Sequence, residues 1–382
     1  MSKKNLIFAK IKKRVLPLNK LTGSLKALSI GDLTIPVPII QGGMGVGVSL
    51  SGLASAVANE GGVGVISSAG LGLLYRDFST DFLVASIYGL KEEIRLAREK
   101  SKGVIGVNIM VAMSNFVDMV KTSISEKVDI IFCGAGLPLD MPSFLKKDST
   151  TKLVPIVSSA RAAKLICEKW HNHYDYLPDA IVVEGPKAGG HLGFKTEQIE
   201  DVNFSLEKLI PDVVEEVSHF EEKYHQQIPV IAAGGIYTGE DIYNIMKLGA
   251  SGVQMGTIFV TTNECDASPD FKQAYIDAKK EDIGIIKSPV GMPGRAIFND
   301  FLEKVRQGKK HPIKCPFKCI KTCDITSSPY CIIIALINAV KGNFNSGYAF
   351  AGSNAFKATS ITSVKETFVK LMTEFKERNS RE

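Results

Sequence analysis

The 382-residue sequence lacks several features that would assign it to a common class of protein. Its most apolar run, residues 331–340, is far shorter than the roughly 20 residues that a membrane-spanning helix needs. No G-x-G-x-x-G or G-x-x-x-x-G-K-[ST] motif marks a nucleotide-binding loop. The sequence also has no G-x-S-x-G, no H-E-x-x-H and no evident pair of carboxylates for hydrolysis. These absences argue against a membrane span, against a Rossmann or P-loop domain and against several classes of hydrolase.

Excess charge of one sign is confined to the N-terminus. The formal net charge is +6, from 46 Lys and Arg against 40 Asp and Glu. Six of the basic residues lie within the first 14 positions, without an acidic residue among them, so the remainder balances at 40 against 40. A neutral body argues against a dedicated nucleic-acid surface. We take residues 1–29 as a basic N-terminal extension, which lacks the apolar stretch of a secretory signal.

Cysteine is present in an odd number, 7, which without a secretory signal predicts a reducing cytoplasm. Four of these residues, Cys315, Cys319, Cys323 and Cys331, gather late in the chain. The first three are spaced four apart and would share one face of a helix. Four thiolates can bind zinc or an iron–sulfur cluster, but this spacing matches no standard C-x-x-C ligand pattern. We therefore predict no metal, and keep the four cysteines as an alternative to be tested.

Short β-branched runs alternate with helical patterns through residues 30–262. Each run is nearly continuously apolar, as parallel strands covered on both faces must be. Eight strands that alternate with helices indicate βαβ units, and predict an α/β protein with a (β/α)8 TIM barrel. The strand candidates are 35–41, 63–68, 104–110, 129–134, 153–158, 180–184, 229–233 and 252–255, the last running on toward Val260. The helix candidates between them are 50–59, 91–100, 116–127, 160–170, 206–224 and 240–248.

The alternation ends after the eighth strand. Residues 263–352 hold a helix candidate at 271–280, a loop at 289–295 and the cysteine-bearing stretch, and are predicted to form a smaller, mostly helical appended domain. Residues 353–382 hold a last helix at 363–376, which is expected to pack back onto the barrel.

Glycines gather at the carboxyl ends of the predicted strands, where barrel enzymes hold their active sites. The loops after the seventh and eighth strands contain Gly234 and Gly235, and residues 254–257. Such loops commonly bind phosphate, because glycine lets backbone N–H groups approach closely. A helix start at Thr238 would add a favourable dipole. Two such loops at matching positions favour a phosphate site over simple tight turns.

Polar residues at other strand ends indicate the chemistry. Gly42 and Gly43 leave room for a flat ring against the backbone, and Asn108 could hydrogen-bond to it. Of the 6 histidines, only His191 lies at a strand end among glycines. An imidazole with an ordinary pKa near 6.5 exchanges protons at neutral pH. We expect a phosphorylated planar cofactor and one acid–base histidine, the division of labour found in flavin enzymes.

Five segments carry a resemblance to a known family. IPVPIIQGGMG, VNIM, VVEGPKAGGHLGF, IPVIAAGGI and GVQMGTIFV resemble the nitronate monooxygenases, whose superfamily includes the flavin-dependent enoyl-acyl-carrier-protein reductases of the FabK type. The resemblance covers roughly residues 30–260, continues more faintly at 348–354, and implies non-covalent FMN. It implies that His191 is catalytic and that the cofactor contacts Gly42, Gly43, Met44, Asn108, Glu184, Gly234, Gly235, Gln254, Met255, Gly256 and Thr257.

The resemblance implies a nitronate monooxygenase first. His191 would take a proton from a nitroalkane carbon or position the nitronate, and O2 would complete the oxidation to a carbonyl compound and nitrite. The alternative is an NAD(P)H-dependent enoyl-acyl-carrier-protein reductase, which would dock an acidic carrier protein on basic residues such as Lys304, Arg306 and Lys310. A flavin-binding sensor without turnover is a third hypothesis, against which a proton-transferring histidine argues. The expected partners are a nitronate or an enoyl thioester with O2 or NAD(P)H, and a homodimer stays open.

Two departures from the family are visible. Lys187 stands where an acidic or apolar residue is usual. If its side chain pointed inward, Lys187 would lower the pKa of His191. We expect the side chain to point outward, where it is solvated. Residues 261–350 match the better-known members poorly, so the resemblance implies no substrate preference.

Overall fold

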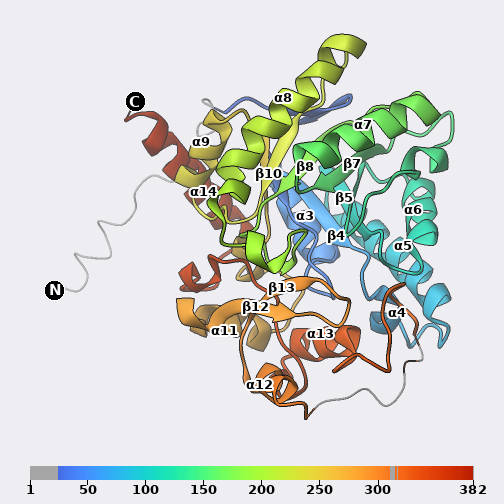
Figure 1. Cartoon of the computed structure of the whole chain (residues 1–382), viewed down its shortest axis with the longest axis vertical. Coiled ribbons are helices and arrows are strands. Elements are labelled where there is room, and N and C mark those ends of the chain that lie inside the picture. Colours follow the sequence, from blue (N-terminus) through green and yellow to red (C-terminus); the bar gives the residue numbers. More distant parts are fainter. Residues whose placement is uncertain (1–24, 310–314, 316, 382) are drawn as a thin grey trace, which may run out of the picture.

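The protein folds around a closed barrel of eight parallel strands, which confirms the predicted fold class (Figure 1). The structure is a computed structural model and describes residues 25–309, 315 and 317–381. Most of the predicted basic extension therefore lies outside the described residues. The barrel strands, in their order around the barrel, are β3 (Ile39–Gln41), β4 (Val63–Ser67), β5 (Val104–Met110), β6 (Ile130–Gly134), β7 (Lys152–Val157), β8 (Ile181–Glu184), β10 (Val230–Ala233) and β11 (Gly252–Met255).

Helices cover the outside of the barrel. They are α3 (Ser51–Asn59), α4 (Leu71–Leu74), α5 (Phe82–Lys100), α6 (Phe116–Ser125), α7 (Ala160–Tyr174), α8 (Leu206–Tyr224), α9 (Gly239–Lys247) and the short α10 (Thr257–Val260). Helix α5 begins at Phe82, well before the predicted start at Lys91, because the Asp81 carboxylate caps it by accepting hydrogen bonds from two backbone N–H groups at 2.9 Å. Only a short 3-10 helix, Met141–Phe144, lies between β6 and β7.

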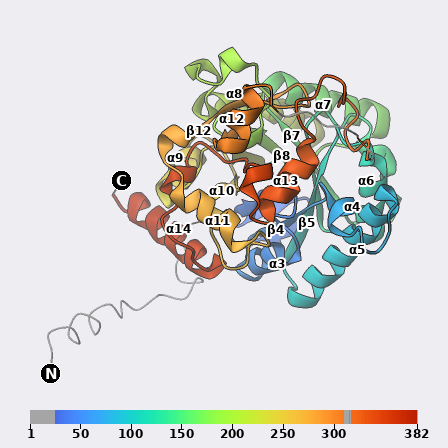
Figure 2. The ribbon, with the colours of Figure 1, turned by 90° about the horizontal axis from the view of Figure 1, so that it is seen from below.

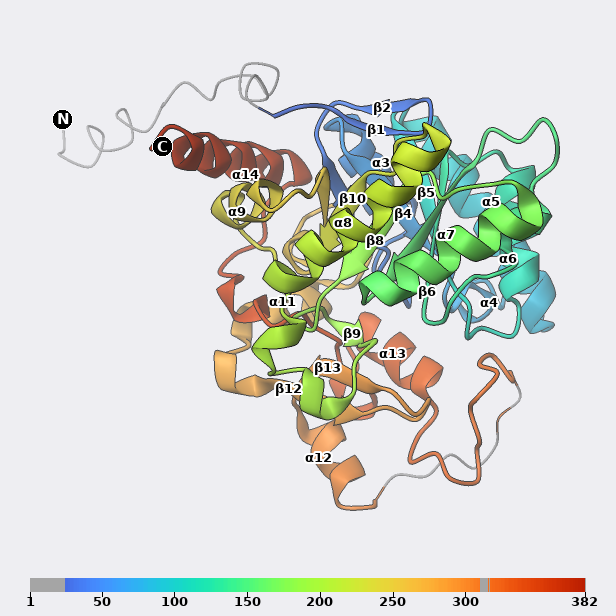
Figure 3. The same cartoon turned by 45° about the horizontal axis from the view of Figure 1, so that its top comes forward.

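The barrel interior is an apolar core. Side chains from several strands, including Ile40, Val65, Phe132, Val182 and Ile231, are fully buried there. A hairpin of β1 (Leu28–Ile30) and β2 (Leu33–Ile35) adds its apolar side chains to this cluster. The hairpin lies across one end of the barrel, the end opposite the appended segment (Figure 3). One end of the barrel is therefore closed by packing, and a site must lie at the other.

Two predicted strands differ from the structure for local reasons. The first candidate, 35–41, is divided because Ile35 belongs to the hairpin, and Pro36 and Pro38 have no N–H for a sheet ladder. The eighth was expected to run on toward Val260, which is wrong. It ends at Met255, and the chain turns at Gly256 into α10.

The appended segment lies beyond the carboxyl ends of the barrel strands (Figures 1 and 2). Its helices are α11 (Pro269–Asp277), α12 (Asp300–Arg306) and α13 (Ile332–Val340). It also contains a three-stranded antiparallel sheet that the sequence did not predict, made of β12 (Ile283–Lys287), β13 (Pro293–Ile297) and β9 (Gly190–His191). Because β9 belongs to the loop after β8, the sheet ties the segment directly to the barrel.

The cysteine-bearing stretch of this segment is not helical. Its described residues form turns, and Ile320 forms an isolated β-bridge with Met113 of the barrel. Cys315, Cys319 and Cys323, which would share one face if the stretch were helical, therefore do not do so.

The chain ends in α14 (Val364–Asn379), close to the predicted helix at 363–376. A capping box between Ser363 and Glu366 starts the helix. Phe368, Leu371 and Phe375 are buried where α14 packs against α9 and α3 (Figure 3). No helix among the described residues is both long and apolar enough to span a membrane.

Candidate functional site

A cavity of about 300 Å³ lies at the carboxyl ends of the strands. Its lining includes all twelve residues that the sequence singled out for catalysis and cofactor binding, from Gly42 to Thr257 together with His191. Ile332, Ile333 and Leu336 of α13 close the cavity from the appended segment. The twelve residues come from the ends of five strands, β3, β5, β8, β10 and β11, and meet there with residues of the appended segment.

The strand register places Glu184, Ala233 and Gln254 side by side at the carboxyl ends of their strands. Ala233 pairs with Glu184 on one side and with Gln254 on the other, so Gly234 follows directly beside both. The fully buried Gln41 fixes the end of β3. Its Oε1 accepts a hydrogen bond from Val65 N at 2.9 Å and its Nε2 donates to Gly42 O at 2.5 Å.

Two loops of glycine backbone present unpaired N–H groups. Gly234 and Gly235 have φ angles of +96° and +85°, which side chains rarely adopt. A Cβ at Gly234 would lie 2.8 Å from Gly185 O, and one at Gly235 would lie 2.8 Å from Lys187 Cβ. Within the described part of the chain, the N–H groups of Gly234, Gly235 and Gly256 have no acceptor. Donors of this kind suit an anion such as a phosphate.

The first N–H groups of α9 have hydrogen-bond partners within the protein. Glu374 accepts a hydrogen bond from Gly239 N at 2.8 Å, and Thr238 Oγ1 accepts one from Asp241 N at 3.1 Å. The first N–H groups of α9 are thus already bonded within the protein, and the glycine loops supply the free donors.

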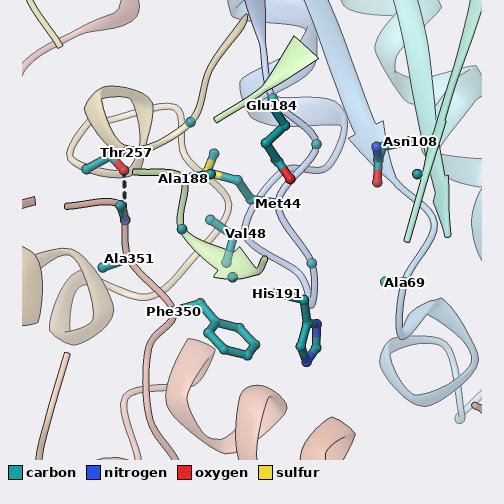
Figure 4. A pocket seen from close by; sticks show the side chains of 18 of the residues that line it. Met44, Val48, Ala69, Asn108, Glu184, Ala188, His191, Thr257, Phe350 and Ala351 are labelled. Carbon is teal, nitrogen blue, oxygen red and sulfur yellow. Dashed lines mark hydrogen bonds between the residues drawn. The ribbon is translucent and has the colours of Figure 1, made fainter. Parts of the chain in front are cut away.

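The ends of β3 and β5 approach closely enough to require a glycine. A Cβ at Gly43 would lie 2.3 Å from Asn108 Cβ and 3.0 Å from Asn108 Cγ. Asn108 lies on β5 and points into the cavity from the opposite side to Thr257 (Figure 4). A flat group could therefore lie over bare backbone at Gly42 and Gly43, with an amide at its edge.

His191 is held at the cavity by the appended segment. As part of β9 it pairs with Gly294 of β13, and its Nε2 lies 2.7 Å from Ser288 Oγ. Its ring lies edge-on to Phe350, with centroids 5.0 Å apart (Figure 4). Burial lowers the pKa of His191 to about 4, so the ring is neutral at pH 7.

The hydrogen bond between His191 and Ser288 can form with either tautomer of His191. In one of them, Ser288 Oγ accepts a hydrogen bond from Val290 N at 3.4 Å and donates its own proton to His191 Nε2. In this arrangement His191 Nδ1 carries the ring proton. Nδ1 has no partner among the described residues, so His191 can offer an N–H to a ligand.

Two charged side chains, Glu184 at the end of β8 and Lys187 in the loop that follows, differ in their exposure to solvent. Burial raises the pKa of Glu184 to about 7. Lys187 is exposed, as expected for a solvated lysine, and has no part in lowering the pKa of His191, which burial alone explains.

Several residues that complete the site were not identified from the sequence. Ser288 and Arg295 belong to no motif. Arg295 is buried and donates to Pro186 O and Ala188 O, at 2.5 and 3.0 Å, so it holds the loop that carries His191. Asn354 Nδ2 donates to Gly235 O at 2.6 Å. The faint resemblance to the family at residues 348–354 was the feature of the sequence that could have identified Asn354.

Of the four candidate metal-binding cysteines, only Cys319 lines the cavity. Burial, together with the neighbouring Cys331, Cys315 and Cys323, raises the pKa of Cys319 to about 12. Its thiol is therefore protonated at neutral pH. In the ranges that the structure describes, no group of three or more His, Cys, Asp or Glu residues is placed to hold a metal ion.

Comparisons with known proteins identify several similar chains. A protein of Staphylococcus aureus (strain Newman) named "Probable nitronate monooxygenase" is 30% identical over 311 residues, covering 72% of this chain and 79% of that protein. The structure of FabK from Thermotoga maritima is similar with a TM-score of 0.70 and 28% identity, covering 90% of this chain and 94% of that one. A nitroalkane oxidase from Streptomyces ansochromogenes shares the fold, with a TM-score of 0.68, 21% identity and coverage of 91% and 98%.

The match to a family model extends over nearly all of the described chain. The model described as "Nitronate monooxygenase" matches residues 26–374, which include the barrel, the appended segment and most of α14. The chain therefore belongs to the nitronate monooxygenase family.

Proposed function

We propose that the protein is an FMN-dependent nitronate monooxygenase, which oxidises an alkyl nitronate with O2 to a carbonyl compound and nitrite. One observation carries the proposal: free glycine N–H donors, a bare backbone surface and a neutral histidine line the same cavity. Membership of the family supports the same activity.

The residues present fit a phosphorylated flavin. The N–H groups of Gly234, Gly235 and Gly256 would bind the phosphate, because they are unpaired and a Cβ at the first two positions would collide with the loop after β8. Gly42 and Gly43 would face the ring, with Asn108 at its edge. Met44, Glu184, Gln254, Met255 and Thr257 complete the proposed contacts. Bound FMN supplies the electron transfer to O2 that no side chain of the site can provide.

His191 is proposed to position the substrate. The sequence left two roles open, a base or a positioning group. A pKa of about 4 makes His191 a weak base at pH 7, whereas its neutral ring can donate a hydrogen bond from Nδ1. A nitronate carries negative charge on its two oxygens, so an N–H donor in a buried site would bind and orient it.

The NAD(P)H-dependent enoyl-acyl-carrier-protein reductase remains the second candidate. The similarity to FabK of Thermotoga maritima, at 28% identity over 90% of this chain, favours it. A carrier protein would need a basic surface. Lys304 and Arg306 of α12 are exposed, although Arg306 also pairs with Glu303 at 3.0 Å, and Lys310 lies outside the described residues.

An oxygen-uptake assay separates these candidates. The purified protein is expected to be yellow, to release FMN on denaturation, and to consume O2 with propionate 3-nitronate without NAD(P)H. Rapid NADH or NADPH oxidation on adding an enoyl thioester, without uptake of O2 with the nitronate, would contradict the proposal and favour the reductase. Bound flavin with neither activity would favour a sensor. The cysteine content supports a cytoplasmic location as part of the same proposal.

A further inference from the structure

A lysine in the loop after β8 lies beside the glycine backbone that is proposed to bind phosphate. A Cβ at Gly235 would have Lys187 Cβ, Cδ and Cγ as its nearest atoms, at 2.8, 3.1 and 3.5 Å. The aliphatic stem of Lys187 therefore runs along Gly235, and its Nζ follows two bonds beyond Cδ. Lys187 as a whole is exposed, yet it lines the cavity. Long basic side chains commonly pack their stems in this way and keep the charged group at the surface.

The backbone around Lys187 is held on both sides. Arg295, buried in β13, donates hydrogen bonds from Nη1 to the carbonyl oxygens of Pro186 and Ala188, at 2.5 and 3.0 Å. Lys187 O accepts a hydrogen bond from Ser353 N at 3.1 Å. The point from which the lysine side chain starts is therefore fixed, so less conformational entropy is lost when its ammonium binds an anion.

Lys187 supplies a positive charge that no other residue of the cavity lining supplies. Among the described residues that line the cavity it is the only lysine or arginine. Glu184 contributes a carboxylate, which would repel an anion, and His191 is neutral at pH 7. Lys357 lies nearby, but its Nζ is over the Tyr237 ring, 5.9 Å from the centroid, and it does not line the cavity. A phosphate monoester carries a charge of about −1.5 to −2 at pH 7, and backbone N–H groups bring no net charge to balance it.

The charged donor and the neutral donors of this end of the cavity are all available to one ligand. The ammonium of Lys187 and the N–H groups of Gly234 and Gly235 lack an acceptor within the part of the chain that the structure describes. A hydrogen bond from an ammonium to a phosphate oxygen is about twice as strong as a hydrogen bond between neutral groups. An anion bound to the glycine N–H groups would therefore gain from contact with Lys187.

We propose that the Lys187 ammonium binds the phosphate of FMN and makes the site select the phosphorylated flavin over riboflavin. The inference rests on the proposed function, because it takes FMN as the cofactor. Since an acidic or apolar residue is usual at this position in the family, the ion pair is a property of this chain and not a consequence of the shared fold.

Flavin binding measures this contact without turnover. The full chain, freed of flavin, is titrated with FMN and with riboflavin, and the change in flavin fluorescence gives a Kd for each. Lys187→Met keeps a stem that can pack on Gly235 and removes the charge. We expect Lys187→Met to weaken the binding of FMN about fivefold to tenfold and to change that of riboflavin by less than about twofold. Lys187→Arg keeps the charge and should restore most of the affinity for FMN.

A lysine away from the site gives the matched control. Lys208 is exposed on α8 and does not line the cavity. Lys208→Met makes the same change in net charge as Lys187→Met, and should bind both flavins like the unaltered protein. A loss of FMN affinity in Lys208→Met equal to that in Lys187→Met would overturn the proposal, because the effect would then come from net charge alone.

Salt gives a second readout. Binding of FMN by the unaltered protein should weaken between about 0.1 and 1 M KCl, since the Debye length falls from about 10 to about 3 Å, and Lys187→Met should lose most of this dependence. Equal affinity of Lys187→Met and the unaltered protein for FMN would overturn this inference alone. An equal loss for FMN and riboflavin would also overturn it, because it would indicate a packing role. Failure of the unaltered protein to bind either flavin would instead overturn the proposed function.

Discussion

Replacing Gly43 with alanine tests the close approach on which the flavin surface depends. The added Cβ would lie 2.3 Å from Asn108 Cβ, where ordinary contacts are 3.4–4 Å. Asn108 cannot rotate away, because its Cβ is fixed by a backbone that pairs with both β4 and β6. Overpacking of this kind costs about 1–3 kcal/mol. At about 2 °C per kcal/mol for a large domain, the Tm should fall by about 2–6 °C.

The neighbouring glycine gives a matched control. A Cβ at Gly42 would meet its nearest atom, Gln254 Cγ, at 3.5 Å, an ordinary contact. Gly42→Ala should therefore leave the Tm of the flavin-free protein unchanged or slightly raised, since alanine reduces the entropy of the unfolded chain. Differential scanning fluorimetry of both variants, with and without FMN, measures the difference. Equal Tm values for Gly43→Ala and Gly42→Ala would refute the close packing of β3 against β5.

Four further predictions concern His191, Ser288 and the glycine loops. His191→Asn should keep bound flavin and lose about 100-fold or more in nitronate kcat, because the shorter amide cannot reach the substrate. The folded-state pKa of His191, about 4, lies below its ordinary 6.5, so its neutral ring supports the fold above pH 6.5 and this contribution is lost as the pH falls toward 4. The unfolding free energy of the unaltered protein should thus fall more steeply over this range than that of His191→Asn, and parallel curves would contradict the shifted pKa. Ser288→Ala removes a 2.7 Å hydrogen bond worth about 1–1.5 kcal/mol and should lower nitronate kcat/KM roughly tenfold without releasing flavin; unchanged kinetics would remove Ser288 from the site. Gly235→Val should release FMN, seen as loss of yellow colour, whereas Gly291→Val, at the same φ of +85° but with no atom within 4 Å, should retain it. Retention by both would contradict the phosphate assignment.

The barrel was readable from the sequence because its strands are buried on both faces. The bounds of β5 and α8 agree with the predicted ones, since apolar runs and amphipathic periodicity mark them without ambiguity. The appended sheet was not predictable in the same way. Strand β12 is partly exposed, and β13 pairs with a two-residue strand about a hundred positions earlier in the chain. Pairing over such a separation leaves no local pattern.

The functional site likewise contains residues that could be predicted from the sequence and residues that could not. Residues that end barrel strands, such as Asn108 and Glu184, could be placed from the rule that barrel sites lie at these ends. Ser288 and Arg295 could not, because their roles depend on the fold of the appended segment over the barrel. The pKa values of His191 and Glu184 also escape the sequence, since both shifts come from burial alone. The boundaries at 1–29, 30–262, 263–352 and 353–382 stay a prediction.

The central claim is that this cavity binds a flavin and oxidises nitronates with O2. The most direct measurement is nitrite formation from propionate 3-nitronate by the purified, flavin-loaded protein in air, with no NAD(P)H present. We predict that nitrite accumulates over many turnovers and that His191→Asn abolishes most of it. Absence of nitrite above the protein-free rate, from a preparation that still holds its flavin, would contradict the account.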